Sequence, residues 1–258
     1  GELAGFALTM KAREKDRRFF NKQVQPNICM LENVAFEQGE INAYIDAVGC
    51  ELFTNAHRAT LSQFAEADNF GSLIRPAAKD VYGLLRLLES KNLSGNLSLL
   101  TTHQNVMKTL KQADYLSPKY HVVIANPPYM GGKGMNNRLK TFLQDNYSDV
   151  KSDLFSAFII RNTELTLPKG QLGFVTPYVW MFISSYEDLR SYILENCTIT
   201  SLAQLEYNAF EPACIPVCSF SLENTHKPNF KGGYVRLSYF RGAENQSPKT
   251  LEAIKNPK

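Results

Sequence analysis

Apolar residues in the second half of the chain recur with the periods of alternating strands and helices. The continuous apolar run 122–125 predicts a short, fully buried strand. Ser152 can cap the helix that follows, and residues 168–170 would end it. The apolar positions of this helix keep helical spacing, at Leu154, Phe155, Phe158, Ile159 and Leu165. A second apolar run, 171–176, predicts another strand, so this order predicts an α/β fold with a mostly parallel sheet.

The patterns on either side of this region predict two further parts. Residues 217–222 and 234–239 alternate between apolar and polar positions and are separated by a Pro- and Gly-containing segment, which predicts an antiparallel hairpin at the end of the sheet. Upstream, residues 36–118 predict a mainly helical insertion. Its two clearest helices each have one apolar side, formed by Val81, Leu84, Leu85 and Leu88 and by Leu99, Val106 and Leu110. No basic face supports a DNA-contacting arm here, so we expect the helices to pack as a hairpin.

The most informative motif follows the strand at 122–125 and consists of Asn126, Pro127, Pro128 and Tyr129. Two consecutive prolines stop the strand and fix the backbone, so Asn126 and Tyr129 would project rigidly from the carboxyl end of the strand. Ligands bind at this end of open α/β sheets. A side-chain carbonyl and a fixed backbone carbonyl can accept both N–H bonds of an exocyclic amine, and an aromatic ring can stack on the base that carries it. A structural Pro-Pro turn with an exposed tyrosine is the alternative.

The loop after the motif, residues 130–136, contains three glycines and one lysine. Gly131 and Gly132 permit close approach of a nucleic-acid backbone, and Lys133 could meet a phosphate. The spacing does not match a phosphate-binding P-loop. These three residues are therefore the predicted DNA contacts.

Composition adds only weak constraints. The chain has 258 residues, 44% apolar content and a formal net charge of +3, which permits nucleic-acid binding without requiring it. Five cysteines without metal-site spacing indicate reduced thiols, a cytoplasmic location and no metal centre. No apolar run is long enough to span a membrane.

Three segments together resemble the catalytic half of γ-type DNA adenine-N6 methyltransferases: the Asn-Pro-Pro-Tyr motif, residues 153–158 and residues 167–177. The longer string 126–136 resembles the PglX family of adenine methyltransferases from BREX phage-exclusion systems and the related type IIG restriction–modification enzymes. Segments 16–20 and 67–74 share this resemblance. It implies a partial Rossmann-like methyltransferase sheet, S-adenosylmethionine as cofactor and double-stranded DNA as substrate, with other phage-defence proteins as further partners.

The resemblance also implies roles for individual residues. Asn126 and Pro127 would hold the amino group of a flipped-out adenine, and Tyr129 would stack on its ring. Phe210 matches the position of a second aromatic on the other face of the base, although a core phenylalanine at a strand end is an equal alternative. Asp68 and Phe70 would contact the adenine of the cofactor. Glu32, after a predicted strand at 28–31, is the alternative for that contact.

The Gly-rich cofactor loop of this family has no counterpart upstream of Asn126. We therefore expect a piece of a larger enzyme that alone binds S-adenosylmethionine weakly or not at all. Its strand at 122–125 would have an unpaired edge that invites self-association. The expected parts are a cofactor-side fragment (1–35), the helical insertion (36–118), the catalytic half (119–245) and a linker toward an absent target-recognition domain (246–258).

Two other functions stay open at this point. Asn-Pro-Pro-Tyr also occurs in protein-glutamine and RNA-guanine methyltransferases, which methylate planar amino groups as well. The missing cofactor loop keeps a non-catalytic subunit possible, one that binds or senses DNA within a defence complex. Methyl transfer to adenine in DNA is the favoured prediction.

Overall fold

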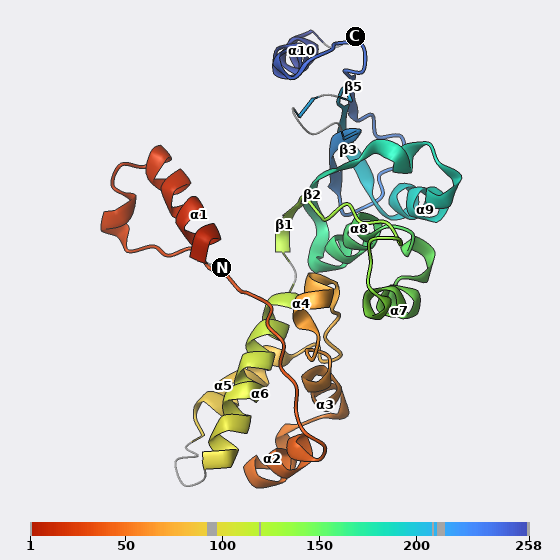
Figure 1. Ribbon diagram of the computed structural model, residues 1–258. Coiled ribbons are helices and arrows are strands. Elements are labelled where there is room, and N and C mark those ends of the chain that lie inside the picture. Colours follow the sequence, from red (N-terminus) through yellow and green to blue (C-terminus); the bar gives the residue numbers. More distant parts are fainter. Residues whose placement is uncertain (1, 92–96, 119, 208, 211–214, 257–258) are drawn as a thin grey trace. The chain divides into compact units, whose positions relative to one another are not determined.

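The computed structural model describes residues 2–91, 97–118, 120–207, 209–210 and 215–256 (Figure 1). They form two compact units, Gly1–Ser117 and Pro118–Lys258. The expected stretches 1–35 and 36–118 both lie in the first unit, apart from residue 118, and the expected catalytic half begins the second. Within the described part of the chain, no helix is both long and apolar enough to cross a membrane.

The first unit is helical throughout its regular structure. Its elements are α1 (Glu2–Lys15), η1 (Phe19–Lys22), α2 (Glu40–Val48), η2 (Cys50–Leu52), α3 (Asn55–Ser62), α4 (Ala67–Phe70), η3 (Gly71–Leu73), α5 (Val81–Glu89) and α6 (Leu97–Leu116). The long helix α6 packs against α2, α3 and α5, so the predicted helical hairpin of α5 and α6 is confirmed (Figure 1). The hydroxyl of Tyr44 on α2 also pairs with Nδ1 of His103 on α6 at 2.6 Å.

The core of this unit follows the apolar stripes that the sequence shows. Leu84 and Leu88 on α5 and Val106 and Leu110 on α6 are all buried. Burying each such side chain contributes roughly 1.5–3 kcal/mol, which outweighs the weak helix propensity of the individual segments. Asp80 caps α5, since its carboxylate accepts a hydrogen bond from the backbone N–H of Gly83 at 3.1 Å.

The predicted strand at 28–31 does not form, and residues 24–37 contain no strand. The backbone of this segment is held by other groups. The side chain of Gln112 on α6 accepts from the N–H of Glu32 at 2.6 Å and donates to its carbonyl at 3.1 Å. The N–H of Val34 donates to the carbonyl of Phe64 at 2.9 Å. An extended segment becomes a strand only beside another strand, and here a helix side chain takes that place.

The second unit contains a five-stranded sheet in the order β1-β2-β4-β3-β5. Its elements are β1 (Tyr120–Ala125), α7 (Asn137–Asn146), η4 (Ser148–Val150), α8 (Leu154–Leu165), β2 (Thr166–Pro177), η5 (Tyr178–Met181), η6 (Ser184–Tyr186), α9 (Glu187–Asn196), β3 (Thr198–Gln204), β4 (Val217–Glu223), β5 (Gly233–Arg236) and α10 (Ala243–Lys255). The β1–β2 and β3–β5 pairs are parallel, whereas β4 is antiparallel to both of its neighbours. Four strands thus share one direction, which confirms the α/β, mostly parallel fold.

The predicted terminal hairpin is wrong, because β4 and β5 do not pair. Instead, β4 lies between β2 and β3, and β5 lies on the far side of β3. The connection after β4 crosses the start of β3, where the Thr198 hydroxyl donates to the carbonyl of Thr225 at 2.6 Å and accepts from the N–H of Lys227 at 2.8 Å. These bonds direct the chain past β3, so β5 adds as a parallel neighbour.

The prediction that β1 is fully buried is also wrong. Val122 is 57% exposed and Ile124 is 79% exposed. On β2, Leu172 and Phe174 on one face are buried, while Gly173 on the other face is half-buried. Because β1 pairs only with β2, it forms one edge of the described sheet, as expected from the sequence. The apolar side chains of Val122 and Ile124 are thus exposed to solvent on one face of β1.

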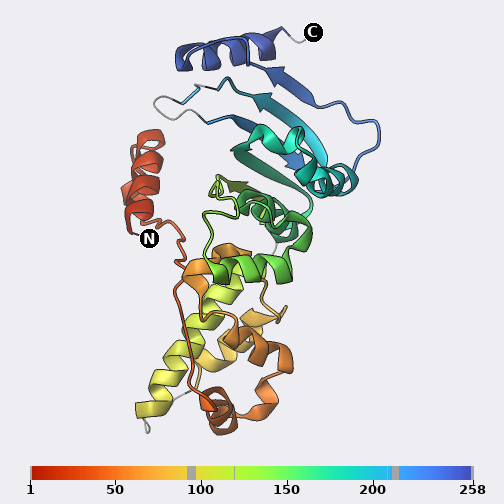
Figure 2. The ribbon, with the colours of Figure 1, turned by 45° about the vertical axis from the view of Figure 1, so that its right-hand side comes forward.

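Part of the expected linker is helical. Residues 246–255 belong to α10, the dark-blue helix in Figure 2, while residues 257–258 lie outside the described part. Buried Gln246 holds this helix to its unit. Its side chain accepts from the N–H of Glu206 at 3.1 Å and donates to the carbonyl of Phe240 at 2.6 Å.

Candidate active site

The Asn-Pro-Pro-Tyr motif leaves the carboxyl end of β1 in the second unit. Asn126 and Pro128 are exposed, Pro127 is buried and Tyr129 is half-buried. The Tyr129 hydroxyl lies 3.1 Å from Oδ1 of Asn126 and 3.1 Å from the carbonyl oxygen of Val175, and it can donate to either. The Asn126 amide is thus open to solvent at the end of a strand, next to an aromatic ring that is fixed at its far end.

The neighbouring strand supplies that fixing point. Val175 lies on β2, which runs parallel to β1, with Ala125 of β1 opposite Phe174 of β2. The carboxyl ends of the two strands therefore lie side by side at one end of the sheet, which is the end where α/β folds bind ligands. Burial raises the pKa of the Tyr129 phenol, so this group stays protonated and remains a hydrogen-bond donor at neutral pH.

The glycine-rich loop after the motif has the geometry of a tight, exposed turn. The N–H of Gly134 donates to the carbonyl of Gly131 at 2.9 Å. A Cβ built on Gly132 would meet no atom within 4 Å, so its backbone faces open space. Lys133 is exposed, and none of the described ion pairs involves it. The three predicted DNA contacts are accessible, and Asn136 ends the loop by capping α7 through the N–H of Leu139 at 2.8 Å.

Asp153, rather than Ser152, caps α8. Its Oδ1 atom accepts from the N–H of Phe155 at 3.3 Å and from the N–H of Met130 at 3.2 Å. Asp153 therefore contacts the residue next to Tyr129, a role that the sequence analysis missed. The signal was present, because Asp is as good a helix cap as Ser and directly precedes the first apolar position of α8.

Phe210 follows β3, and its side chain is 51% exposed. Because β3 runs in the same direction as β1, Phe210 and Tyr129 both follow strands that end on the same side of the sheet. Two strands separate β1 from β3, so the strand ends are roughly 14 Å apart at the usual interstrand spacing. Phe210 and Tyr129 are not among the described ring contacts. The exposure of Phe210 argues against the alternative of a core phenylalanine.

The three residues predicted to contact the cofactor all lie in the first unit. The N–H of Asp68 donates to the side chain of Asn33 at 3.0 Å, so the segment that carries Glu32 lies next to α4. The Asp68 side chain is exposed, and Phe70 is half-buried against the core. Glu32 lines an open cavity of about 810 Å³, where it forms an ion pair with Lys108.

These positions differ in how well they suit an adenine ring. A free carboxylate can accept the amino N–H of adenine, and an accessible aromatic edge can contact the ring. Asp68 and Phe70 offer both within one turn of helix. Glu32 is less suitable, since Lys108 already neutralises its carboxylate. Of the three residues, Asp68 and Phe70 therefore offer the groups that an adenine ring needs, and Glu32 offers fewer.

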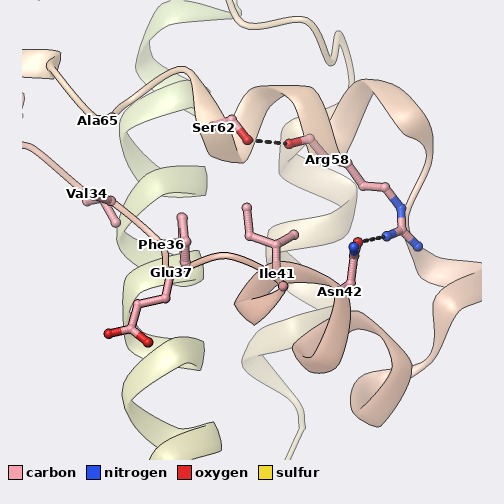
Figure 3. Close-up of a pocket in the computed structure, with 10 residues that line it drawn as sticks. Val34, Phe36, Glu37, Ile41, Asn42, Arg58, Ser62 and Ala65 are labelled. Carbon is pink, nitrogen blue, oxygen red and sulfur yellow. Dashed lines mark hydrogen bonds between the residues drawn. The ribbon is translucent and has the colours of Figure 1, made fainter.

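A second pocket of the first unit, about 370 Å³ in volume, lies between α2, α3 and the segment before α2 (Figure 3). Val34, Phe36 and Ile41 give it an apolar lining, and Arg58 at its margin is bonded to Oδ1 of Asn42 at 2.7 Å. None of the predicted site residues lines this pocket.

Comparison with known proteins establishes the family. The sequence profile of the Eco57I restriction-modification methylases matches residues 4–210, which include the Asn-Pro-Pro-Tyr motif. The chain belongs to this family. The match extends across most of both units, from α1 to Phe210. The resemblance found in the sequence is thereby confirmed.

Curated relatives of this Eco57I-family chain include two adenine-specific methyltransferases. BrxX of Escherichia coli O9:H4 (strain HS) is 32% identical over 92% of this chain and 22% of BrxX. PglX of Lacticaseibacillus casei (strain Zhang) is 29% identical over 99% of this chain and 22% of PglX. The chain thus spans about a fifth of the length of these relatives. Among solved structures, the Type ISP restriction-modification enzyme LlaGI with a DNA substrate mimic matches 64% of this chain and 15% of its own, at 15% identity and a TM-score of 0.43.

Proposed function

We propose that the protein containing this chain transfers a methyl group from S-adenosylmethionine to the N6 amino group of adenine in double-stranded DNA, for phage defence or restriction-modification. The observation that carries the proposal is the exposed Asn126 amide at the carboxyl end of β1, beside the buried Pro127 and the anchored Tyr129 ring. Membership of the Eco57I family and the adenine-specific relatives BrxX and PglX support the same reaction.

The first part of the mechanism concerns the amino group. The lone pair of adenine N6 is delocalised into the ring, so the nitrogen is a weak nucleophile. Oδ1 of Asn126 and the carbonyl oxygen of Pro127 would each accept one of its two N–H bonds. Both acceptors are fixed by the Pro127–Pro128 backbone, so they favour the tetrahedral, more nucleophilic nitrogen without reorganising during the reaction.

The second part concerns the base. A duplex hides adenine N6, so the base has to leave the stack, and an aromatic ring compensates for part of the stacking that is lost. The ring of Tyr129 would supply one face. Phe210, which is exposed, would supply the other. An arriving amino group would compete with the Tyr129 hydroxyl for Oδ1 of Asn126, and the hydroxyl can keep its bond to Val175.

S-adenosylmethionine, when bound, supplies the electrophilic methyl group. Asp68 would accept the amino N–H of the cofactor adenine, and Phe70 would contact the ring. Glu32 is the second candidate for this contact.

The loop after Tyr129 would contact the DNA backbone. Lys133, which forms none of the ion pairs described for this structure, brings a positive charge, and Gly131 and Gly132 allow the backbone of the loop to approach phosphates closely. These contacts position the DNA and carry no sequence information of their own.

Replacement of Asn126 tests the proposal. In the complete protein, Asn126→Ala should abolish adenine methylation of the host genome, read by single-molecule sequencing, while DNA binding persists. Asn55→Ala is the matched control, because Asn55 is an exposed asparagine at the start of α3 and has no described side-chain bond. Methylation by the Asn126→Ala protein at the level of the control would refute the assignment.

A further inference from the structure

The residue that follows Tyr129 is held on both sides of its peptide backbone. The N–H of Met130 donates to Oδ1 of Asp153 at 3.2 Å, and the carbonyl of Met130 accepts from the N–H of Leu154 at 3.0 Å. Gly131 forms an antiparallel bridge with Asp153. The chain just after the Asn-Pro-Pro-Tyr motif is therefore attached to the first turn of α8.

The carboxylate of Asp153 binds both the loop after Tyr129 and the first turn of α8. The Oδ1 atom of Asp153 that binds Met130 also caps α8 through the N–H of Phe155 at 3.3 Å, and the backbone carbonyl of Asp153 accepts from the Ser156 hydroxyl at 2.7 Å. Burial raises the pKa of the Asp153 carboxyl, and bonds from backbone N–H groups only partly offset this rise. A half-buried carboxylate shared by a loop and a helix end leaves little freedom to either.

Tyr129 is thus fixed at two points. Its hydroxyl is bonded to the carbonyl of Val175 on β2, and its backbone continues directly into the peptide that Asp153 holds. The backbone bond fixes the end from which the ring projects, and the hydroxyl bond limits its rotamer changes. Together the two bonds fix both ends of the long axis of the ring.

We infer that Asp153 is a positioning residue for the target base: its carboxylate holds the Met130 peptide, and thereby the Tyr129 ring, in the place where the ring stacks on a flipped adenine. This inference rests on the proposed function. It assigns to Asp153 no contact with substrate or cofactor. It differs from a purely structural capping role, because helix capping alone needs only the bond to Phe155.

Variants of Asp153 separate the two roles. Ser caps helices as well as Asp does, but its shorter side chain does not reach as far toward Met130. Asp153→Ser should keep α8 intact and loosen the loop, because it removes the side-chain bond to the N–H of Met130. Asp153→Asn keeps a carbonyl oxygen at the same distance from Cβ and should rescue the loop. Asp149→Ser is the control, because Asp149 is an exposed aspartate in the same unit, four residues upstream.

The measurements use the complete protein. For Asp153→Ser we expect faster hydrogen exchange at Met130 with unchanged exchange within α8, a weaker fluorescence rise from 2-aminopurine at the target position, and a loss in kcat/KM of about 100-fold, the cost of roughly 1 Å of misplacement. Asp153→Asn and Asp149→Ser should stay within about threefold of the wild type in kcat/KM, a difference of under 1 kcal/mol.

Two results would overturn the inference. One is an Asp153→Ser protein with wild-type fluorescence and wild-type kcat/KM, which would reduce Asp153 to a helix cap. The other is unchanged exchange at Met130, which would show that the loop is held by other contacts. Failure of the proposed function looks different, since the wild-type protein would then leave adenine unmethylated under every condition.

Discussion

Two substitutions of Tyr129 separate the contribution of its ring from that of its hydroxyl. Tyr129→Ala removes the surface on which the flipped base would stack. Stacking of one base on an aromatic side chain contributes about 1–3 kcal/mol, so base capture should weaken by roughly 5- to 150-fold. Tyr129→Phe keeps the ring and removes only the hydroxyl.

The structure gives the size of the second effect. The Tyr129 hydroxyl lies at hydrogen-bond distance from the carbonyl of Val175 and from Oδ1 of Asn126, but it has one proton to donate. Removing one neutral hydrogen bond costs about 0.5–1.5 kcal/mol, which corresponds to roughly a 2- to 12-fold loss. Pro127 and Asp153 continue to hold the backbone on either side, so we expect Tyr129→Phe to lie at the lower end of this range.

The assay is a titration of DNA that carries 2-aminopurine at the target adenine, followed by single-turnover methylation. Tyr82→Ala is the control, because Tyr82 is a 60% exposed tyrosine on α5. Equal losses for Tyr129→Phe and Tyr129→Ala would refute the stacking role and assign the effect to the hydroxyl. Full activity of Tyr129→Ala would refute both roles.

Three further predictions concern binding, assembly and pH. Lys133→Ala should lower the salt dependence of DNA binding by about one unit of slope, in a plot of log affinity against log salt concentration, whereas the exposed Lys79→Ala should not. The 258-residue chain should self-associate through the β1 edge, seen by light scattering, and Ile124→Lys should make it monomeric; a monomeric parent chain would contradict this. Burial lowers the pKa of His103 below its usual 6.5, so the unfolded chain takes up the proton more readily than the folded first unit. The first unit should therefore lose stability as the pH falls below 6.5 and through the lowered pKa, measured by hydrogen exchange of α2 and α6, and His103→Gln should remove this dependence.

Local patterns predicted the elements that frame the site. The apolar run before Asn126 and the helical spacing after residue 153 depend on neighbours within a few positions, and β1 and the start of α8 formed where they were expected. The expected end of the helix at residues 168–170 is wrong, because α8 ends at Leu165 and these residues lie within β2. Accessibility of Asn126 followed from the two prolines, which end the strand at its carboxyl edge. Asp153 was missed by one position, although it is as good a cap as Ser152 and directly precedes the first apolar position of α8.

The failures all depend on distant parts of the chain. The exposure of Ile124 depends on which other parts of the chain cover that face of the sheet, and the apolar sequence of β1 does not encode this. The path of the chain around Thr198 decided that β4 and β5 would not pair. The side chain of Gln112, 80 positions from Glu32, binds the backbone of Glu32 in place of the neighbouring strand that a strand at 28–31 would have needed. Contacts at such separations leave no local signature in the sequence.

The most direct test of the account is a structure of the complete protein bound to its DNA site and to a non-reactive analogue of S-adenosylmethionine. The account predicts an extruded adenine with N6 at about 3 Å, the ordinary hydrogen-bond distance, from both Oδ1 of Asn126 and the carbonyl oxygen of Pro127, and with its ring on Tyr129. A target adenine that remains in the duplex, or an N6 atom that faces other groups, would contradict it.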